Sequence, residues 1–365
     1  PGSSQVWLGF RCLGGSATFE VVGSSSSESG AGQVKQPSEE PRLTPAMRQY
    51  WEQKQQAGDA ILLFRMGDFY ELFYDDAKLA ARVLGLTLTS RDGGKTPLAG
   101  IPHHALESYL SKLVAAGYRV AISEQVEDPR QARGVVRRAL VRVVTPGTLT
   151  EESLLDRTRS NLLAAVCVEG KEAGIAALEL STGEFEVQLC PEARLLDELV
   201  RLAAAEVLLP EPQTPGPHLL AAALREQTSA ALTYRNASEF TVHRAEQLLR
   251  EHFGTSGLEG FGFERMDASL QAAGALLGYV RETQVADRGS PGILAHVRPP
   301  RRRAVSEHML LDPTTLRALE VERTLRTGAR EGSLLAAVDR TSNPMGARLL
   351  RNWLCYPLRD VERIR

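Results

Sequence analysis

Between residues 44 and 147, short apolar runs alternate with amphipathic stretches, and this alternation restricts the possible fold more than any other feature of the chain. The runs typical of strands cover residues 60–65, 86–89, 118–122 and 138–144. The stretches typical of helices start at 45, 74 and 105 and end at Gly58, Gly85 and Gly117. The alternation predicts a compact α/β domain of roughly 100 residues.

A second α/β unit is predicted after a linker at residues 148–158. It opens with three apolar runs at 161–168, 174–180 and 184–189, separated by short turns. A further strand is expected at 206–209, and helices are expected at 193–204, 217–226, 238–253 and 269–283. The three-strand opening suggests a ribonuclease H-like fold.

The two ends of the chain differ from these units. Residues 1–42 are rich in Ser and Gly, cannot bury enough apolar surface to order themselves, and are predicted to be a disordered leader. A Pro- and Gly-rich stretch at 289–300 indicates a domain boundary, followed by an expected strand at 307–311 and a helical pattern from Asp312 onward. Because this pattern reaches Arg365 without a breaker, we expect a third domain that is cut off.

Composition is that of a globular chain, with 43% hydrophobic and 24% charged residues in 365. The formal net charge of -2 does not by itself point to nucleic acid, but arginines cluster locally, as phosphate-binding stripes or as solvated faces. These clusters comprise Arg130, Arg133, Arg137, Arg138 and Arg142, and separately Arg298 and Arg301 to Arg303. Four cysteines without metal or disulfide spacing, and no long apolar window, favour a reducing, cytoplasmic setting and no membrane.

Several catalytic motifs are incomplete. Gly94-Lys95-Thr96 resembles the end of a phosphate-binding loop, but the glycine required five positions earlier is Thr89. A two-metal nuclease needs carboxylates on the first strand of the second unit, where only Glu169 stands, at the end. Glu179, Glu184 and Glu186 are predicted to lie on the solvent face of their strands. His103 and His104 are adjacent, which makes them a poor pair of metal ligands.

The segment Phe64–Phe73 places a carboxylate, Glu71, among aromatic and apolar residues, two positions after Phe69. An exposed ring can stack on a nucleic-acid base while a neighbouring carboxyl group bonds to that base. The residues alone leave open the alternative that Phe69 is a core aromatic.

Several blocks, in order along the chain, resemble the MutS family of DNA mismatch-recognition proteins. The blocks are LTPAM at 43–47, FRMGDFYELF at 64–73, PLAGIP at 97–102, VTPGT at 144–148, NLLAA at 161–165, GFG at 260–262 and NPMGARLL at 343–350. The resemblance covers about residues 43 to 365. It implies a mixed-sheet α/β mismatch-recognition domain at 43–147, a ribonuclease H-like α/β connector domain at 159–290, and the start of an α-helical core or lever domain at 291–365.

The resemblance also implies cofactors and partners. ATP and Mg²⁺ belong to a C-terminal ATPase domain of the family, so this chain is expected to hold no cofactor or metal and not to be an enzyme. The implied partners are duplex DNA with a mismatch or small loop, a second copy in the full-length family, and downstream repair factors that bind the connector domain.

The residues carried over are few. Phe69 and Glu71 match the family's Phe-x-Glu motif, in which the ring stacks on a mispaired base and the carboxyl group bonds to it. Met66 and Asp68 flank the motif and are expected near the DNA. Four arginines are candidates for contacts with the DNA backbone, namely Arg65, Arg91, Arg137 and Arg138. Two alternatives remain, a protein-interaction fragment that does not bind DNA on its own, and a ribonuclease H-like nuclease.

Overall fold

The structure is a computed structural model and describes residues 44–128, 130, 134–151, 153–156, 159–212, 218–263, 265–284, 294–303 and 307–365. The predicted disordered leader at 1–42 lies outside these residues, as do Arg133 and the first part of the boundary at 289–300.

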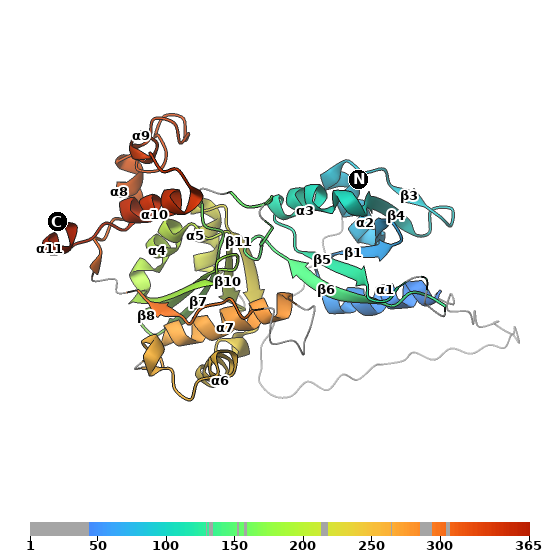
Figure 1. Cartoon of the computed structure of the whole chain (residues 1–365), viewed down its shortest axis with the longest axis horizontal. Helices are drawn as coiled ribbons and strands as arrows, with labels where there is room; N and C mark the ends of the chain where they lie inside the picture. Colours follow the sequence, from blue (N-terminus) through green and yellow to red (C-terminus); the bar gives the residue numbers. More distant parts are fainter. Residues whose placement is uncertain are drawn as a thin grey trace, which may run out of the picture. The chain divides into compact units, whose positions relative to one another are not determined.

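The first unit is a six-stranded mixed sheet with the order β3-β4-β2-β1-β5-β6 (Figure 1). Its strands are β1 (Ile61–Met66), β2 (Phe69–Phe73), β3 (Thr89–Ser90), β4 (Pro97–Pro102), β5 (Val120–Gln125) and β6 (Arg138–Val144). Strands β1 and β5 are parallel, and every other neighbouring pair in the described sheet is antiparallel. The predicted mixed-sheet α/β fold is confirmed.

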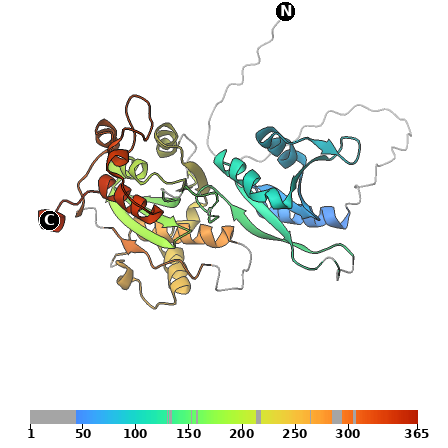
Figure 2. The same ribbon diagram turned by 45° about the horizontal axis from the view of Figure 1, so that its top comes forward.

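Three helices cover the two faces of this sheet, α1 (Pro45–Ala57) on one and α2 (Tyr74–Leu84) with α3 (Leu106–Ala115) on the other (Figures 1 and 2). Side chains alternate along β1, so that Leu62 and Phe64 pack toward α1 while Ile61 and Leu63 pack toward α2 and α3. Two thin apolar cores therefore hold the sheet from both sides.

The second unit has a six-stranded sheet with the order β11-β10-β7-β8-β9-β12. The strands are β7 (Leu162–Glu169), β8 (Glu172–Glu179), β9 (Glu184–Pro191), β10 (Glu206–Pro210), β11 (Ala231–Arg235) and β12 (Arg301–Arg302). Strands β7, β8 and β9 form an antiparallel meander, and β10 and β11 add in parallel beside β7. This arrangement agrees with the predicted ribonuclease H-like domain.

Helices again cover both faces of the second sheet (Figure 1). Helices α4 (Leu195–Leu202) and α5 (Leu219–Gln227) pack on one face, and α6 (Val242–Phe253) and α7 (Ala268–Thr283) belong to the core of the other. Helix α7 approaches β8 so closely that a Cβ at Gly174 would lie 2.1 Å from the backbone of Ala268. Glycine at this position therefore permits the contact between helix and sheet.

The last segment contains α8 (Pro313–Ala318), α9 (Leu334–Val338), α10 (Pro344–Cys355) and α11 (Val361–Ile364). The helical pattern expected from Asp312 is confirmed as four separate helices, and it is interrupted between α8 and α9, where Glu320, Gly328 and Gly332 adopt positive φ. The strand expected at 307–311 is reduced to a single bridge between His308 and Leu358. Within the described residues, no helix is long and apolar enough to cross a membrane.

Candidate nucleic-acid interface

Strands β1 and β2 form a tight hairpin that carries the Phe-x-Glu segment. Met66 pairs with Phe69, leaving Gly67 and Asp68 as a two-residue turn. Gly67 has a φ of 61°, and a positive φ at the first turn position is the pattern of a type II′ turn. The carbonyl of Asp68 accepts a hydrogen bond from the backbone N–H of His103 at 2.8 Å. The turn is thereby fixed to the end of β4.

Phe69 is exposed at the tip of this hairpin. Its residue surface is 48% accessible, whereas Phe64 and Phe73 on the same face are 1% and 6% accessible. Beneath the ring lies Gly100 of β4, where a Cβ would stand 3.7 Å from the Phe69 ring. The alternative that Phe69 is a core aromatic is therefore wrong, and Met66 beside it is half-buried.

Glu71 lies on the same face as Phe69 but is buried, with 8% of its surface accessible. One carboxylate oxygen accepts a hydrogen bond from Arg91, and the other, Oε2, accepts none from any described residue. Burial raises the pKa of Glu71, and the charges of Arg91 and Arg138 oppose that rise. A carboxyl group with one unused oxygen thus stands behind an exposed ring.

Arg91 belongs to the turn between β3 and β4, which is held by its own side chains. Asp92 accepts hydrogen bonds from Ser90 Oγ at 2.6 Å and from Thr96 at 2.8 Å (backbone N–H) and 2.6 Å (hydroxyl). These bonds lower the pKa of Asp92 to about 2. Gly94 also donates its N–H to Ser90 Oγ at 2.9 Å. These hydrogen bonds fix the conformation of the turn, and Arg91 on it points toward Glu71.

The structure places the other three predicted arginines differently. Arg65 pairs with Tyr70 across the hairpin, on the face opposite Phe69, and its Nη1 lies 3.7 Å from Glu124 Oε2. Arg138 stacks 5.2 Å from the centroid of Phe64 and donates to the Val136 carbonyl at 2.8 Å. Arg137 is exposed, as is Asp68. Of these arginines, the hairpin face with Phe69 and Glu71 thus holds Arg91 and Arg138.

Two carboxylates in the second unit make buried contacts that the sequence pattern did not predict. Glu179 was predicted on a solvent face, but it is buried and pairs with Arg348 at 3.1 Å. Glu206, which was not singled out, is fully buried and accepts four hydrogen bonds. Their partners lie far away in the sequence, and the one local signal is that Glu206 begins the apolar strand β10, whereas Glu179 ends β8 and carries no such signal. Among the described residues, no three His, Cys, Asp or Glu side chains are grouped as metal ligands.

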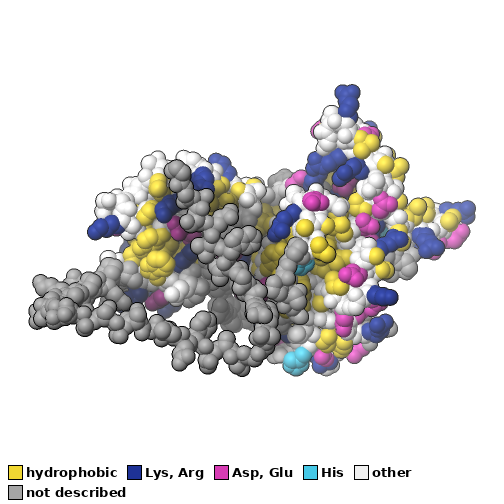
Figure 3. Space-filling view, turned by 180° about the vertical axis from the view of Figure 1, so that it is seen from behind, with side chains coloured by type: hydrophobic (Ala, Val, Ile, Leu, Met, Phe, Trp, Pro, Cys, Tyr) yellow, Lys and Arg dark blue, Asp and Glu magenta, His cyan; other side chains and the backbone are white. Residues whose placement is uncertain are grey.

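The second arginine cluster serves internal contacts in the structure. Arg302 pairs with Asp267 at 2.6 Å, and Arg303 pairs with Glu186 at 2.7 Å. On the face shown in Figure 3, basic and acidic side chains are interspersed rather than gathered by sign. These ion pairs favour a structural role for this cluster.

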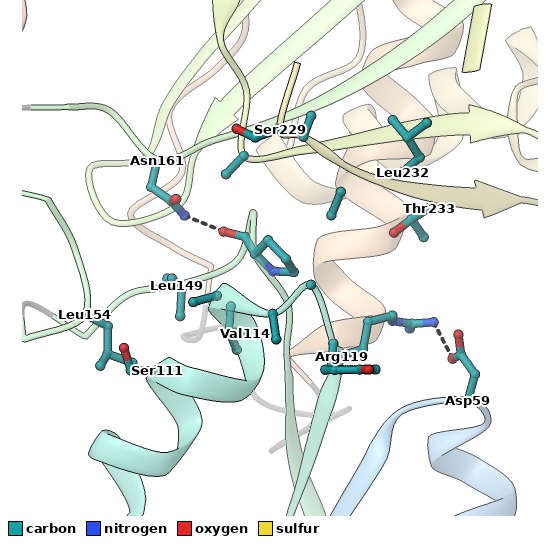
Figure 4. Close-up of a pocket in the computed structure, with 18 of the residues that line it drawn as sticks. Asp59, Ser111, Val114, Arg119, Leu149, Leu154, Asn161, Ser229, Leu232 and Thr233 are labelled. Atoms are coloured by element: carbon teal, nitrogen blue, oxygen red, sulfur yellow. Dashed lines mark hydrogen bonds and ion pairs between the residues drawn. The ribbon is translucent and has the colours of Figure 1, made fainter. Parts of the chain in front are cut away.

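A cavity of about 850 Å³ lies elsewhere in the molecule, lined by residues of both α/β units and of the intervening segment (Figure 4). On its wall, Arg119 pairs with Asp59 at 2.7 Å, and Asn161 donates to the Pro146 carbonyl at 2.9 Å. None of the residues predicted to contact DNA lines it. We therefore place the candidate interface at the hairpin.

Comparison with known proteins identifies the units described above. Residues 44–153 match MutS domain I, residues 161–291 match MutS domain II, and residues 314–365 match MutS domain III. The fold is thus that of a protein built from the first three MutS domains in their usual order. The chain belongs to the MutS family.

Relatives at high identity carry the same description. The chain is 46% identical over 348 residues to the DNA mismatch repair protein MutS of Rhodopirellula baltica, covering 88% of this chain and 38% of that protein. It is 44% identical over 336 residues to that of Symbiobacterium thermophilum, covering 88% and 37%, and 44% identical over 343 residues to that of Synechococcus elongatus, covering 90% and 38%. The chain therefore spans less than two fifths of the length of these curated relatives.

Proposed function

We propose that this chain recognises mismatched or unpaired bases in duplex DNA, as the sensor part of a MutS-like mismatch-repair protein. The Phe69 ring enters the base stack, and the Glu71 carboxylate accepts a hydrogen bond from the base beside it. The observation that carries the proposal lies on one hairpin face, where a 48% exposed ring stands beside a buried carboxyl group. One oxygen of this group has no hydrogen-bond partner among the described residues.

The wedge selects by deformability rather than by sequence. Separating a base step costs on the order of a few kcal/mol and kinks the duplex. Stacking of an aromatic ring on a base contributes about 1 to 3 kcal/mol. A mispaired step opens more easily than a paired one, so the balance favours insertion at a mispair.

The sheet beneath the hairpin suits a wedge because it is well packed. Tyr50 of α1 packs edge-on against Phe64 and Phe73, with ring centroids 5.7 Å and 4.9 Å apart. The backbone N–H of His103 bonds to the Asp68 carbonyl of the turn. The packed core and this bond therefore hold the Phe69 ring in position when it meets the base stack.

Glu71 adds a penalty at correctly paired sites. A carboxylate close to DNA phosphates is repelled, and this weakens binding to perfect duplex. At a mispair, a base donor bonded to the unused oxygen offsets this repulsion. Glu71→Ala is therefore expected to keep or raise affinity for perfect duplex.

Paired titrations of mismatched and perfect duplexes of one length, at one salt concentration, test the proposal with Phe69→Ala. The variant is expected to lose the preference for mismatched duplex by about fivefold or more, the lower limit of one stacking contact. The matched control is Leu88→Ala, which removes an exposed side chain (46% accessible) from the same domain. A preference that survives Phe69→Ala would overturn the proposal.

The main alternative is that the chain acts only in protein interaction, through residues 159–290. We propose that these residues contact repair partners in either case. Binding of such a partner that is unaffected by Phe69→Ala, together with DNA binding that shows no mismatch preference, would favour this alternative.

A further inference from the structure

We propose that Arg91 is a positioning residue that sets mismatch discrimination by holding the Glu71 carboxylate in place, with Oε1 occupied and Oε2 free for a base. The inference rests on the proposed function and extends it to a residue outside the Phe-x-Glu segment. It assigns Arg91 a role beyond a phosphate contact, because its guanidinium bonds to the carboxyl group that would bond to the base.

The geometry around Glu71 supports this role. The Glu71 side chain is 10% accessible, whereas that of Arg91 is 65% accessible. The buried partner is therefore fixed by β2 and β4, and the exposed partner reaches over it from the β3–β4 turn. A carboxylate held by one charge-assisted hydrogen bond has a defined orientation, which leaves its second oxygen as a pre-oriented acceptor.

The turn that carries Arg91 is stabilised independently of DNA. Asp92 bonds to Ser90 and to Thr96, so the backbone next to Arg91 is held before any ligand arrives. Arg91 therefore reaches Glu71 without first ordering a loop, and the arrangement is ready for a base.

Two cations face Glu71, Arg91 from the β3–β4 turn and Arg138 from β6. In the part of the chain that the structure describes, Arg138 is held against Phe64 and the Val136 carbonyl and donates no hydrogen bond to Glu71. Removal of Arg91 therefore leaves Arg138 facing the carboxyl group without a hydrogen bond that orients it. The Glu71 side chain can then rotate, and because its pKa rises further, it is ionised over a narrower range of pH.

A double-mutant cycle on the complete chain tests this role, with the ratio of dissociation constants for perfect and mismatched duplex as readout. Arg91→Gln is expected to lower this ratio by about tenfold, comparable to the loss of one charge-assisted hydrogen bond. In a Glu71→Gln background, Arg91→Gln is expected to leave the ratio unchanged, because its target is gone. Arg91→Lys, which keeps the cation, is expected to restore most of the ratio.

Lys95→Gln is the matched control, since Lys95 is an exposed cation on the same turn and takes part in no ion pair among the described residues. Lys95→Gln is expected to weaken binding to mismatched and perfect duplex equally, as loss of a phosphate contact does.

The dependence of the ratio on pH is a second test. As pH is lowered and Glu71 becomes protonated, the ratio for Arg91→Gln is expected to fall at a higher pH than that of the wild type. Loss of a phosphate contact would not produce this shift.

The outcomes separate the two proposals. If the wild-type ratio depends on Phe69 but Arg91→Gln behaves like Lys95→Gln, the role of Arg91 is overturned and the proposed function stands. If the wild type shows no preference and Phe69→Ala changes nothing, both proposals fail. Circular dichroism of each variant confirms that a lost ratio does not reflect unfolding.

Discussion

Glu71 and Glu206 are both buried carboxylates, but they are bonded very differently. Glu206 accepts hydrogen bonds on both oxygens, from Thr145 and Gly147 on one and from Thr233 and Tyr279 on the other. Among the residues that the structure describes, Glu71 has one bonded oxygen and one, Oε2, without a hydrogen-bond partner. Buried acceptors without partners are uncommon and costly in folded proteins, and a ligand can complete them. This difference distinguishes the fully bonded Glu206 from Glu71, which our proposal makes available to a DNA base.

The free energy of unfolding should reveal the cost of burying the Glu71 carboxylate. Burial raises its pKa above the ordinary value of 4.5. The folded state therefore holds the proton more tightly, so the contribution of Glu71 is favourable below pH 4.5 and is lost as pH rises through the raised pKa. Glu71→Gln does not titrate, and its stability relative to the wild type is expected to increase from pH 4 toward neutrality, as measured by urea unfolding.

Asp92 provides a control of opposite sign. Hydrogen bonds from Ser90 and Thr96 lower its pKa to about 2, so its contribution is present above its ordinary pKa of 3.8 and is lost as pH falls through about 2. Relative to the wild type, Asp92→Asn is therefore expected to lose stability as pH rises from about 2 to 4. A Glu71→Gln difference that stays flat, or follows the sign of Asp92→Asn, would contradict the assignment of Glu71 as a carboxyl destabilised by burial.

At the scale of elements, the close crossing of α6 and α7 depends on one glycine. A Cβ at Gly274 would lie 2.3 Å from Cα and Cβ of Ala245, a distance that real Cβ atoms do not adopt. Gly278, one turn further along α7, would place its Cβ 3.5 Å from Leu248, an ordinary contact. Both glycines lie on α7, but α6 leaves room for a Cβ at position 278 and none at position 274.

Alanine at these two glycines is therefore expected to have opposite effects on stability. Gly274→Ala forces the helices apart and should lower the free energy of unfolding by about 1 to 3 kcal/mol. Gly278→Ala should raise it by roughly 0.5 to 1 kcal/mol, because alanine loses less backbone entropy in a helix. Thermal or urea unfolding measures both, and equal effects of the two substitutions would show that helix propensity rather than the crossing decides.

Local patterns predicted the elements that end at clear signals. The helix from Pro45 is confirmed, with Thr44 Oγ1 accepting from the Met47 N–H at 3.3 Å and Gly58 at its end. Strands β2 and β4 were missed, because a Glu in one and prolines at both ends of the other mask a strand pattern. Both are defined by pairing with neighbours, since Glu71 lies opposite Gly100 and Phe64. Such pairing is a property of the sheet and not of either segment.

In the candidate site, too, local sequence signals were predictive, whereas contacts between distant segments were not. The sequence singled out Phe69 and Glu71 through an unusual carboxylate beside a ring, and the exposure of the ring agrees with that interpretation. The bond between Glu71 and Arg91 was not predicted, because it joins β2 to a turn after β3 and depends on the strand order of the sheet. Alternation along β1 turns Arg65 to the face opposite Phe69, and its contact with the DNA backbone stays a prediction.

For the molecule as a whole, Glu206 is a junction between parts of the chain that are distant in sequence. Its donors come from the segment after β6, from β11 and from α7. Burial, and then the charge of Glu206, raises the pKa of the Tyr279 phenol, which keeps it a hydrogen-bond donor across the accessible pH range. One carboxylate thereby ties the end of the first α/β unit to a strand and a helix of the second.

Glu206→Gln keeps the shape of the side chain but replaces one acceptor oxygen by an amide that can only donate. Two of the four donors then lose their acceptor in a fully buried site, and the free energy of unfolding should fall by roughly 2 to 4 kcal/mol. Tyr279→Phe removes one donor and should cost about 1 kcal/mol. In the double variant the two costs should not add, because both substitutions disturb the same network.

Hydrogen exchange locates where this loss acts. Because the Gly147 N–H donates to Glu206, its protection in Glu206→Gln should fall more than that of amides in the β1–β2 hairpin, which lie within the first sheet. The matched control is Glu226→Gln, an exposed carboxylate on α5, which should stay within about 0.5 kcal/mol of the wild type. If Glu206→Gln were equally neutral, the junction would be held by apolar packing alone. A uniform loss of protection, including the hairpin, would instead show that the two α/β units unfold as one cooperative body.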